Sequence, residues 1–274
     1  MTLALTIEYH TKQIAIADSW LERFEDAAIQ AFEDDRAMVL AMVADNRREA
    51  LRRKAMPNWN ALGREIGEYF SGASAENWQS IFAPVIEGII GETGEEWSAI
   101  LGVSFDVRNL AGEEWFQEYI LEFAQDISQT SNDVIQQVIA QGLASDSTVD
   151  ELADQLGMVF EQWMQGTLTK EDFEWLQARM PDFRREMIAR TESLRALNTG
   201  TFELGKSWGM TEKEWLTEID GRERDSHHSA NKQRRAMDQP FDVGTSQLMH
   251  PLDSSLGASP DEIINCRCTL LLHR

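Results

Sequence analysis

The hydrophobic pattern of the chain changes near Gly209, and this change decides the fold class. Up to about residue 205, apolar side chains recur every three or four residues, which is typical of amphipathic helices. After Gly209, the segment Glu214–Ile219 alternates like a strand, and Cys268–Leu272 is a second, apolar strand candidate. The sequence therefore predicts an α+β protein, with a mainly helical N-terminal body and a small C-terminal α+β domain that contains a short antiparallel sheet.

Helix-breaking and capping residues divide the helical part into segments. A long helix is expected over residues 10–55, because Pro57 cannot continue it. Two helices are expected in residues 58–104, separated by the small residues Ser71–Ser74, and a turn over residues 104–111 follows. Further helices are expected over Glu113–Ile127, from about Thr130 to Gly142, from the capping box Thr148–Glu151 onward, and from Pro181 to about Gly205.

Charge is distributed unevenly along the chain. Residues 1–180 contain 12 Lys and Arg against 32 Asp and Glu, a net charge of −20, whereas residues 181–274 contain 13 against 15, a net charge of −2. An acidic surface repels DNA phosphates, so the larger part is not expected to bind nucleic acid; it would suit a partner with a basic face, or simply keep the protein soluble. Together with the helix boundaries, this predicts an acidic helical region at 1–103, a helical body at 104–180 and a C-terminal domain at 181–274.

The two cysteines and the lack of a long apolar run indicate the compartment. Cys266 and Cys268 are too close in sequence for an unstrained disulfide, which favours a reducing environment and synthesis in a cytoplasm. No stretch approaches the roughly 20 apolar residues that a membrane span needs, so no membrane contact is expected.

Residues 219–274 concentrate the side chains that could form a metal site. This stretch contains four of the five histidines and both cysteines. Within it, His227, His250, Cys266 and Cys268 are residue types that bind zinc, and strand alternation would place both sulfurs on one face. Because the spacing is not a standard zinc signature, two interpretations stay open: a zinc site formed by His227, Cys266 and Cys268, or a buried thiol pair with no cofactor.

Arginine and carboxylate side chains are expected to hold the C-terminal domain together. If the first strand continued, its alternation would place Asp220, Arg222 and Arg224 on one side. Guanidinium groups form paired hydrogen bonds with carboxylates, so these arginines would bind Asp253 or Glu192. The predicted structural network consists of Arg190, Glu192, Asn198, Asp220, Arg222, Arg224, His227, Asp253, Asn265 and Arg267.

An enzyme is the alternative interpretation of the same residues. The arginines could bind a phosphate while His227 and a carboxylate catalyse nuclease or nucleotide-transfer chemistry. The sequence contains no Walker motif, no GxGxxG and no GxSxG. No catalytic residue is therefore assigned, and an enzymatic activity is not the favoured prediction.

Four short motifs, in this order and spacing, resemble the phage Mu F-like minor head protein family, also called the head morphogenesis family of tailed phages. The resemblance extends over roughly residues 104–274. In this chain, Arg224 and His227 stand where some relatives have a Cys-x-x-Cys pair, which makes zinc less expected here. The four motifs are Ala189–Glu192 (ARTE), Asp220–His227 (DGRERDSH), Pro251–Asp253 (PLD) and Asn265–Cys268 (NCRC).

The resemblance implies a structural role inside the virion. Such a protein would bind the portal protein and the inner capsid or scaffold proteins during procapsid assembly. It could accompany the DNA during ejection, with DNA as an indirect partner only. Relatives fused to toxin modules suggest a toxin-associated adaptor as a further alternative. The resemblance implies no catalytic activity and no obligatory cofactor.

Overall fold

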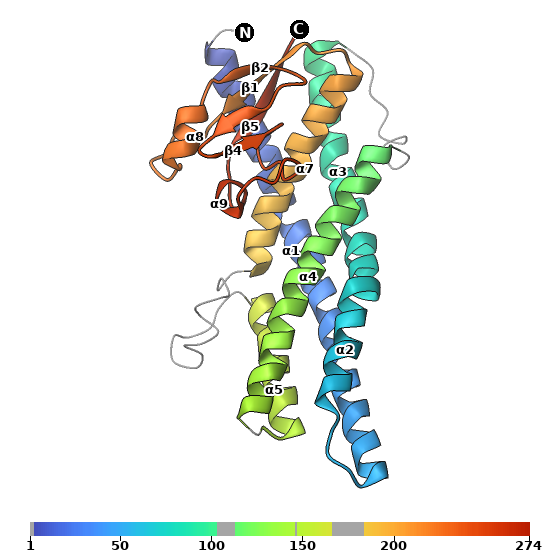
Figure 1. Cartoon of the computed structure of the whole chain (residues 1–274). Helices are drawn as coiled ribbons and strands as arrows, with labels where there is room; N and C mark the ends of the chain where they lie inside the picture. Colours follow the sequence, from blue (N-terminus) through green and yellow to red (C-terminus); the bar gives the residue numbers. More distant parts are fainter. Residues whose placement is uncertain (1–2, 103–112, 146, 166–183) are drawn as a thin grey trace. The chain divides into compact units, whose positions relative to one another are not determined.

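The computed structural model describes residues 3–102, 113–145, 147–165 and 184–274 (Figure 1). The turn predicted over residues 104–111 and the helix start predicted at Pro181 lie outside the described residues. Among the described helices, none combines the length and the apolar character needed to cross a membrane.

Long helices form the part of the chain that precedes the first strand. The mainly helical body predicted from the sequence is thereby confirmed. In chain order the elements are α1 (Leu3–Arg53), α2 (Trp59–Tyr69), a π-helical segment (Phe70–Ser74), α3 (Ala75–Leu101), α4 (Glu114–Ala144), α5 (Val149–Gln165) and α7 (Arg184–Ser207).

Two predicted helix breaks are wrong. Ser71–Ser74 belongs to the π-helical segment that joins α2 directly to α3, in which Phe70 and Ser74 are buried. A π-turn absorbs an extra residue without ending the helix. The helix α4 also continues through Thr130 and Ser131, because their hydroxyls donate hydrogen bonds of 2.8 and 2.9 Å to backbone carbonyls one turn earlier instead of capping a new helix.

The capping box predicted before α5 is confirmed. The backbone N–H of Thr148 donates to Glu151 Oε2 at 2.7 Å, and the N–H of Glu151 donates to Thr148 Oγ1 at 3.2 Å. Two backbone donors at the helix start are thus satisfied by side chains, which fixes where α5 begins.

The chain forms two compact units, each built from segments that are far apart in sequence. Unit 1 comprises Met1–Glu25, Pro84–Trp115 and Glu186–Arg274, and unit 2 comprises Asp26–Ala83 and Phe116–Arg185. The helix α1 contributes its first half to unit 1 and its second half to unit 2. The division at residues 103 and 180 made from the sequence stays a prediction.

Aromatic side chains form the core of unit 2. The rings of Phe32 and Trp78 lie 4.9 Å apart and those of Phe82 and Phe123 lie 4.7 Å apart, all fully or almost fully buried. The carboxylate of Asp35 is buried in this core and accepts a hydrogen bond of 2.9 Å from Trp78 Nε1. Burial raises the pKa of Asp35, and donors such as the indole N–H offset part of that effect.

Unit 1 contains the sheets, as the sequence predicted. A three-stranded antiparallel sheet has the strand order β2-β1-β5, and β3 pairs with β4 in a separate hairpin. The elements are β1 (Glu212–Leu216), α8 (Asp225–Ala230), β2 (Arg234–Ala236), β3 (Phe241–Val243), β4 (Ser246–Leu248), α9 (Pro260–Ile263) and β5 (Thr269–His273).

Within unit 1, α7 packs tightly against β5 and α3. A Cβ atom at Gly205 would lie 2.7 Å from Leu272 Cδ1 on β5, and a Cβ atom at Gly200 would lie 2.8 Å from Ile90 Cγ2 on α3. The two glycines therefore permit a close approach that larger residues would obstruct. Figure 1 shows the sheet beside the C-terminal half of α7 and the first turns of α1.

Candidate metal centre

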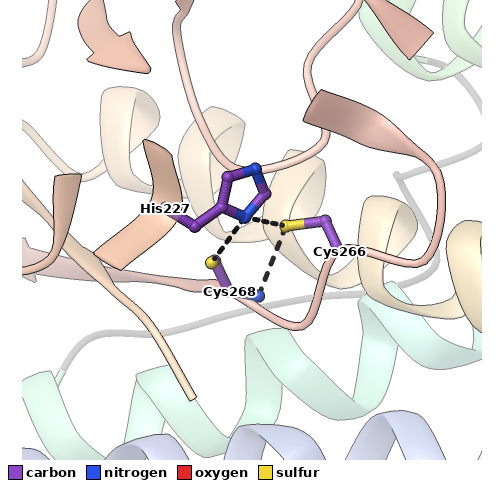
Figure 2. Close-up of side chains that lie close together, drawn as sticks. All are labelled: His227, Cys266 and Cys268. Carbon is purple, nitrogen blue, oxygen red and sulfur yellow. Dashed lines mark hydrogen bonds between the residues drawn. The ribbon is translucent and has the colours of Figure 1, made fainter. Parts of the chain in front are cut away.

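Three side chains of types that can bind a metal meet in the interior of unit 1. His227 comes from α8, and Cys266 and Cys268 come from the segment between α9 and β5 (Figure 2). The Nδ1 atom of His227 lies 3.6 Å from Cys266 Sγ and 3.4 Å from Cys268 Sγ. All three side chains are buried, with at most 2% of their surface exposed.

A tight turn after β1 brings His227 to this position. Glu223 Oε2 accepts hydrogen bonds from the backbone N–H groups of Asp220 (3.2 Å) and Gly221 (2.7 Å), and Gly221 adopts φ +82°. Glycine suits this left-handed conformation because it has no Cβ. The chain then enters α8, whose buried face includes His227 and Ala230.

A second reversal of the chain orients the two cysteines. Asn265 has φ +55°, a conformation that asparagine tolerates better than most residues, and its N–H donates to Thr191 Oγ1 at 3.1 Å. The motif around Thr191 on α7 therefore anchors the start of the NCRC segment. The backbone N–H of Cys268 then donates to Cys266 Sγ at 3.4 Å, which keeps both sulfurs on the same side.

The imidazole of His227 is oriented from its other nitrogen. Its Nε2 lies 3.0 Å from Glu262 Oε2, so an Nε2–H donor leaves the Nδ1 lone pair facing the sulfurs. The Glu262 carboxylate also accepts a 2.7 Å hydrogen bond from Ser226 Oγ. A Cβ atom at Gly244 would lie only 2.5 Å from Glu262 Oε1, so the glycine leaves room for this carboxylate.

The pKa values of the two thiols are shifted in opposite directions. Burial raises the pKa of Cys266 well above the usual value of a thiol. Burial also acts to raise the pKa of Cys268, but interactions with Cys266 and His227 outweigh it and lower that pKa to about 5.

The predicted arginine contacts differ from those observed. Both terminal guanidinium nitrogens of Arg267 donate to the Asp220 carboxylate at 2.7 Å, and Arg222 donates to it as well. These bonds, those from Arg267 first, hold the pKa of Asp220 well below its usual value. Arg224 instead donates to the backbone carbonyl of Ile264 at 2.5 Å.

The predicted pairing of these arginines with Asp253 or Glu192 is therefore wrong. The strand β1 ends at Leu216, so Asp220, Arg222 and Arg224 lie on a turn rather than on one face of a strand. Glu192 pairs with Arg195 of its own helix at 3.4 Å. Asp253 accepts hydrogen bonds from the backbone N–H groups of Met249 (2.7 Å) and Ser255 (2.9 Å), which closes a loop.

Two further predicted residues lie away from the cluster. Arg190 pairs with Glu186 on the same helix at 2.5 Å, as their i, i+4 spacing predicts, and it is largely exposed. His250 is buried against the ring of Phe202, and its Nδ1 lies 3.0 Å from the Pro251 carbonyl. His250 is therefore held by its own loop and does not join the three ligating side chains.

Asn198 connects α7 to the free edge of β5. Its side-chain nitrogen donates to the Cys268 carbonyl at 3.0 Å, and its side-chain oxygen accepts from the Leu270 N–H at 2.9 Å. Because β5 lies at one edge of the sheet, these backbone groups have no strand partner. At this position, the buried side-chain amide of Asn198 therefore forms the two hydrogen bonds that a neighbouring strand would otherwise form.

Comparison with known proteins assigns this region to a family. Residues 133–271, about half of the chain, match the family described as phage Mu protein F like protein. The chain belongs to the phage Mu protein F like family. The family indicates a phage head morphogenesis protein, located in the phage head and interacting with other head components. No curated protein and no solved structure matches the chain.

The Mu F-like region contains the whole candidate centre. It includes α7, β1 to β4, the first residues of β5, and the side chains of His227, Cys266 and Cys268. The resemblance stated from the four sequence motifs is therefore confirmed at the level of the family. The roles assigned to the individual residues of those motifs stay predictions.

Two chemistries fit the side chains of the Mu F-like centre: metal binding and nucleophilic catalysis. Cys268, His227 and Glu262 form a thiol–imidazole–carboxylate chain of the kind that activates a nucleophile. However, one imidazole nitrogen needs only one thiol partner for that chemistry, and here both sulfurs converge on it. Cys268 is also only 1% exposed.

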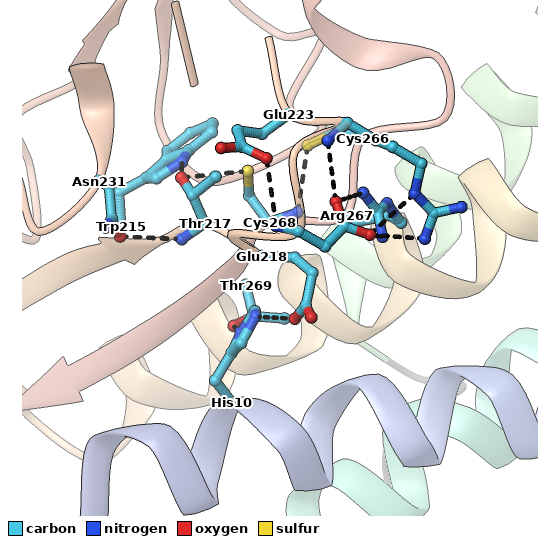
Figure 3. Close-up of polar contacts among 12 residues, drawn as sticks. His10, Trp215, Thr217, Glu218, Glu223, Asn231, Cys266, Arg267, Cys268 and Thr269 are labelled. Atoms are coloured by element: carbon cyan, nitrogen blue, oxygen red, sulfur yellow. Dashed lines mark hydrogen bonds and ion pairs between the residues drawn. The ribbon is translucent and has the colours of Figure 1, made fainter. Parts of the chain in front are cut away.

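Sequence reasoning missed Glu262 beside the centre and His10, which lies on α1 outside the Mu F-like region. No sequence pattern indicated Glu262, because its hydrogen bond with His227 forms only when α9 lies against α8 in the folded protein. His10 was also missed: its Nε2 lies 2.7 Å from Glu218 Oε2, and its Nδ1 lies 2.6 Å from Thr269 Oγ1 (Figure 3). A residue on the first helix that contacts the last strand cannot be recognised from local spacing.

Proposed function

We propose that this protein is a minor component of a tailed-phage head that binds the portal protein, or the inner capsid and scaffold proteins, while the procapsid assembles. The observation that supports this most strongly is the family match over residues 133–271, which includes nearly all of the C-terminal sheet region. On this proposal the protein lies inside the virion and contacts DNA only indirectly.

The internal contacts of the sheet region support an adaptor rather than a reaction centre. Asn198, Asp253 and Thr191 are buried and use their polar atoms to bind backbone groups of the same unit. Because these polar atoms bind the backbone of their own unit, they stabilise its fold. Partners would then contact the outer surface of the unit. The acidic first 180 residues, with a net charge of −20, suit a partner that presents a basic face.

Co-expression with neighbouring phage genes tests the portal proposal. The full chain is produced together with the products of the adjacent open reading frames and separated by size. We expect it to elute with a ring-sized assembly that contains the portal protein. The variant Asn198→Leu, which disrupts the edge of β5, should lose this association, whereas Asn60→Ala on the exposed side of α2 should keep it. A folded wild-type chain that elutes alone beside assembled rings would refute the proposal.

We also propose that the protein leaves the head together with the DNA. Mass spectrometry of virions before and after DNA release in vitro tests this step. The chain should be present in filled particles and depleted from emptied ones. Equal amounts in filled and emptied particles would show that the protein stays in the head, and would contradict this proposal.

A further inference from the structure

We propose that His227 Nδ1, Cys266 Sγ and Cys268 Sγ bind one zinc ion, which joins α8 to the segment that enters β5. The ion connects these two parts of unit 1. This inference does not depend on the proposed role in head assembly, because it rests only on the geometry of the three side chains.

The two nitrogen–sulfur distances already match a tetrahedral ion. Zinc binds cysteine sulfur at about 2.3 Å and histidine nitrogen at about 2.0–2.1 Å, so a tetrahedral angle separates the two ligand atoms by about 3.5 Å. The observed separations from His227 Nδ1 are 3.6 Å to Cys266 Sγ and 3.4 Å to Cys268 Sγ. An ion can therefore enter without moving the imidazole away from either sulfur.

The imidazole is held in the tautomer that a metal needs. Metal-binding histidines commonly donate their second N–H to a carboxylate, which orients the ring and raises its basicity. Glu262 takes this position at 3.0 Å from His227 Nε2. The hydroxyl of Ser226 and the close approach of Gly244 restrict the carboxylate further. We assign Glu262 as a positioning residue that acts through His227.

Charge balance suits a buried ion. Two thiolates neutralise one divalent cation, and a neutral imidazole adds no charge. A neutral complex incurs a smaller desolvation cost than isolated charges in the buried surroundings of these side chains. Three protein ligands leave one position of the tetrahedron, which we assign to water. Their burial of 98% or more keeps larger molecules from that position.

Metal analysis of the full chain is the direct test. The protein is purified after growth with added zinc, and its metal content is measured by plasma mass spectrometry. We expect about one zinc per chain, and a lower melting temperature after removal of the ion with a chelator. Replacement by cobalt should give the intense visible bands of tetrahedral thiolate coordination. A wild-type chain without zinc and without these cobalt bands would overturn the proposal.

Variants separate a specific site from adventitious binding. Cys268→Ser and Cys266→Ser should lose the zinc and the cobalt spectrum. Glu262→Gln should keep the fold but bind zinc about 10- to 100-fold more weakly, since it still accepts from His227 without the negative charge. The matched control is His228→Gln, which changes the exposed neighbour of His227 and should leave the metal content unchanged. Equal zinc in all four variants would overturn the site.

Discussion

At the scale of single residues, Asn198 is the side chain on which the Mu F-like region most depends. It is fully buried on α7, and it provides both a donor and an acceptor to the edge of β5. Its loss leaves the Cys268 carbonyl and the Leu270 N–H buried without these partners. Each unsatisfied buried group costs about 1–3 kcal/mol.

We therefore expect Asn198→Leu to lower the free energy of unfolding by about 3 kcal/mol or more. Chemical denaturation followed by fluorescence measures this change. Asn60→Ala serves as the control, because Asn60 is exposed on α2 and its replacement should change stability by less than about 0.5 kcal/mol. Similar midpoints for the two variants would contradict the role of Asn198 at the sheet edge.

Lys213 is a second unusual residue, because its ammonium group is fully buried on β1. The group donates to the Met237 carbonyl at 3.0 Å and lies 4.6 Å from the centre of the Phe202 ring. Burial lowers the pKa of Lys213 to about 8, although Asp253 acts to raise it. Between this value and the ordinary lysine pKa of about 10.4, the unfolded chain binds more protons than the folded chain.

The stability of the protein should therefore rise with pH across that interval. Below about pH 8 the charged group destabilises the fold, and by about pH 10.4 this effect is relieved, a gain of up to about 3 kcal/mol. Other groups also titrate there, so the measurement is the difference in unfolding free energy between wild type and Lys213→Met. Parallel stability curves for the two proteins would show that Lys213 does not have a lowered pKa.

Contacts between individual side chains were also the feature that the sequence predicted least well. The types and order of His227, Cys266 and Cys268 predicted a possible zinc site, and the structure brings these side chains together. The pairing of Arg222 and Arg224 with Asp253 or Glu192 was wrong, because it depended on a strand that ends at Leu216. Partners across a turn are decided by backbone geometry, which spacing alone does not reveal.

At the scale of elements, Gly88 sets how closely α1 and α3 approach each other within unit 1. The indole of Trp20 on α1 covers Gly88, and its Nε1 donates to Glu92 Oε2 at 2.7 Å. A Cβ atom at Gly88 would lie 2.1 Å from Trp20 Cη2, closer than atoms can pack. The indole or the helix must therefore shift to accept any side chain.

Gly88→Ala should lower stability by about 1–2 kcal/mol, because overpacking costs more than alanine gains as a helix former. The melting temperature of the full chain measures this change. Gly72→Ala is the matched control: a Cβ atom at Gly72 meets nothing within 4 Å, so this variant should be neutral or slightly more stable. If both variants melt at the same temperature, α1 and α3 do not depend on this contact.

Helices were predicted more reliably than their ends. The apolar stripes and the Thr148–Glu151 capping box located helices correctly, because both signals are local. The breaks expected at Ser71–Ser74 and near Thr130 were wrong, since buried packing and back-bonded hydroxyls kept those helices continuous. Small and hydroxyl residues weaken a helix without deciding whether it ends.

At the scale of the whole molecule, the net charge of −22 should govern association with head proteins. If the acidic region binds a basic surface, raising the salt from about 0.1 M to about 1 M shortens the screening length from about 10 Å to about 3 Å and weakens the complex. The apparent dissociation constant of the isolated complex, measured across this range, should increase. Binding that strengthens with salt would indicate an apolar interface instead.

The contact between the hydroxyl of Tyr9 and the carbonyl of Leu270 joins residues 261 positions apart. During translation, Tyr9 is synthesised early and β5 much later. The helix α1 therefore emerges from the ribosome before its hydrogen-bond partner on β5 has been made. The sheet of unit 1 can therefore form only after β5 has been translated. If translation stops earlier, the resulting chain cannot complete this unit.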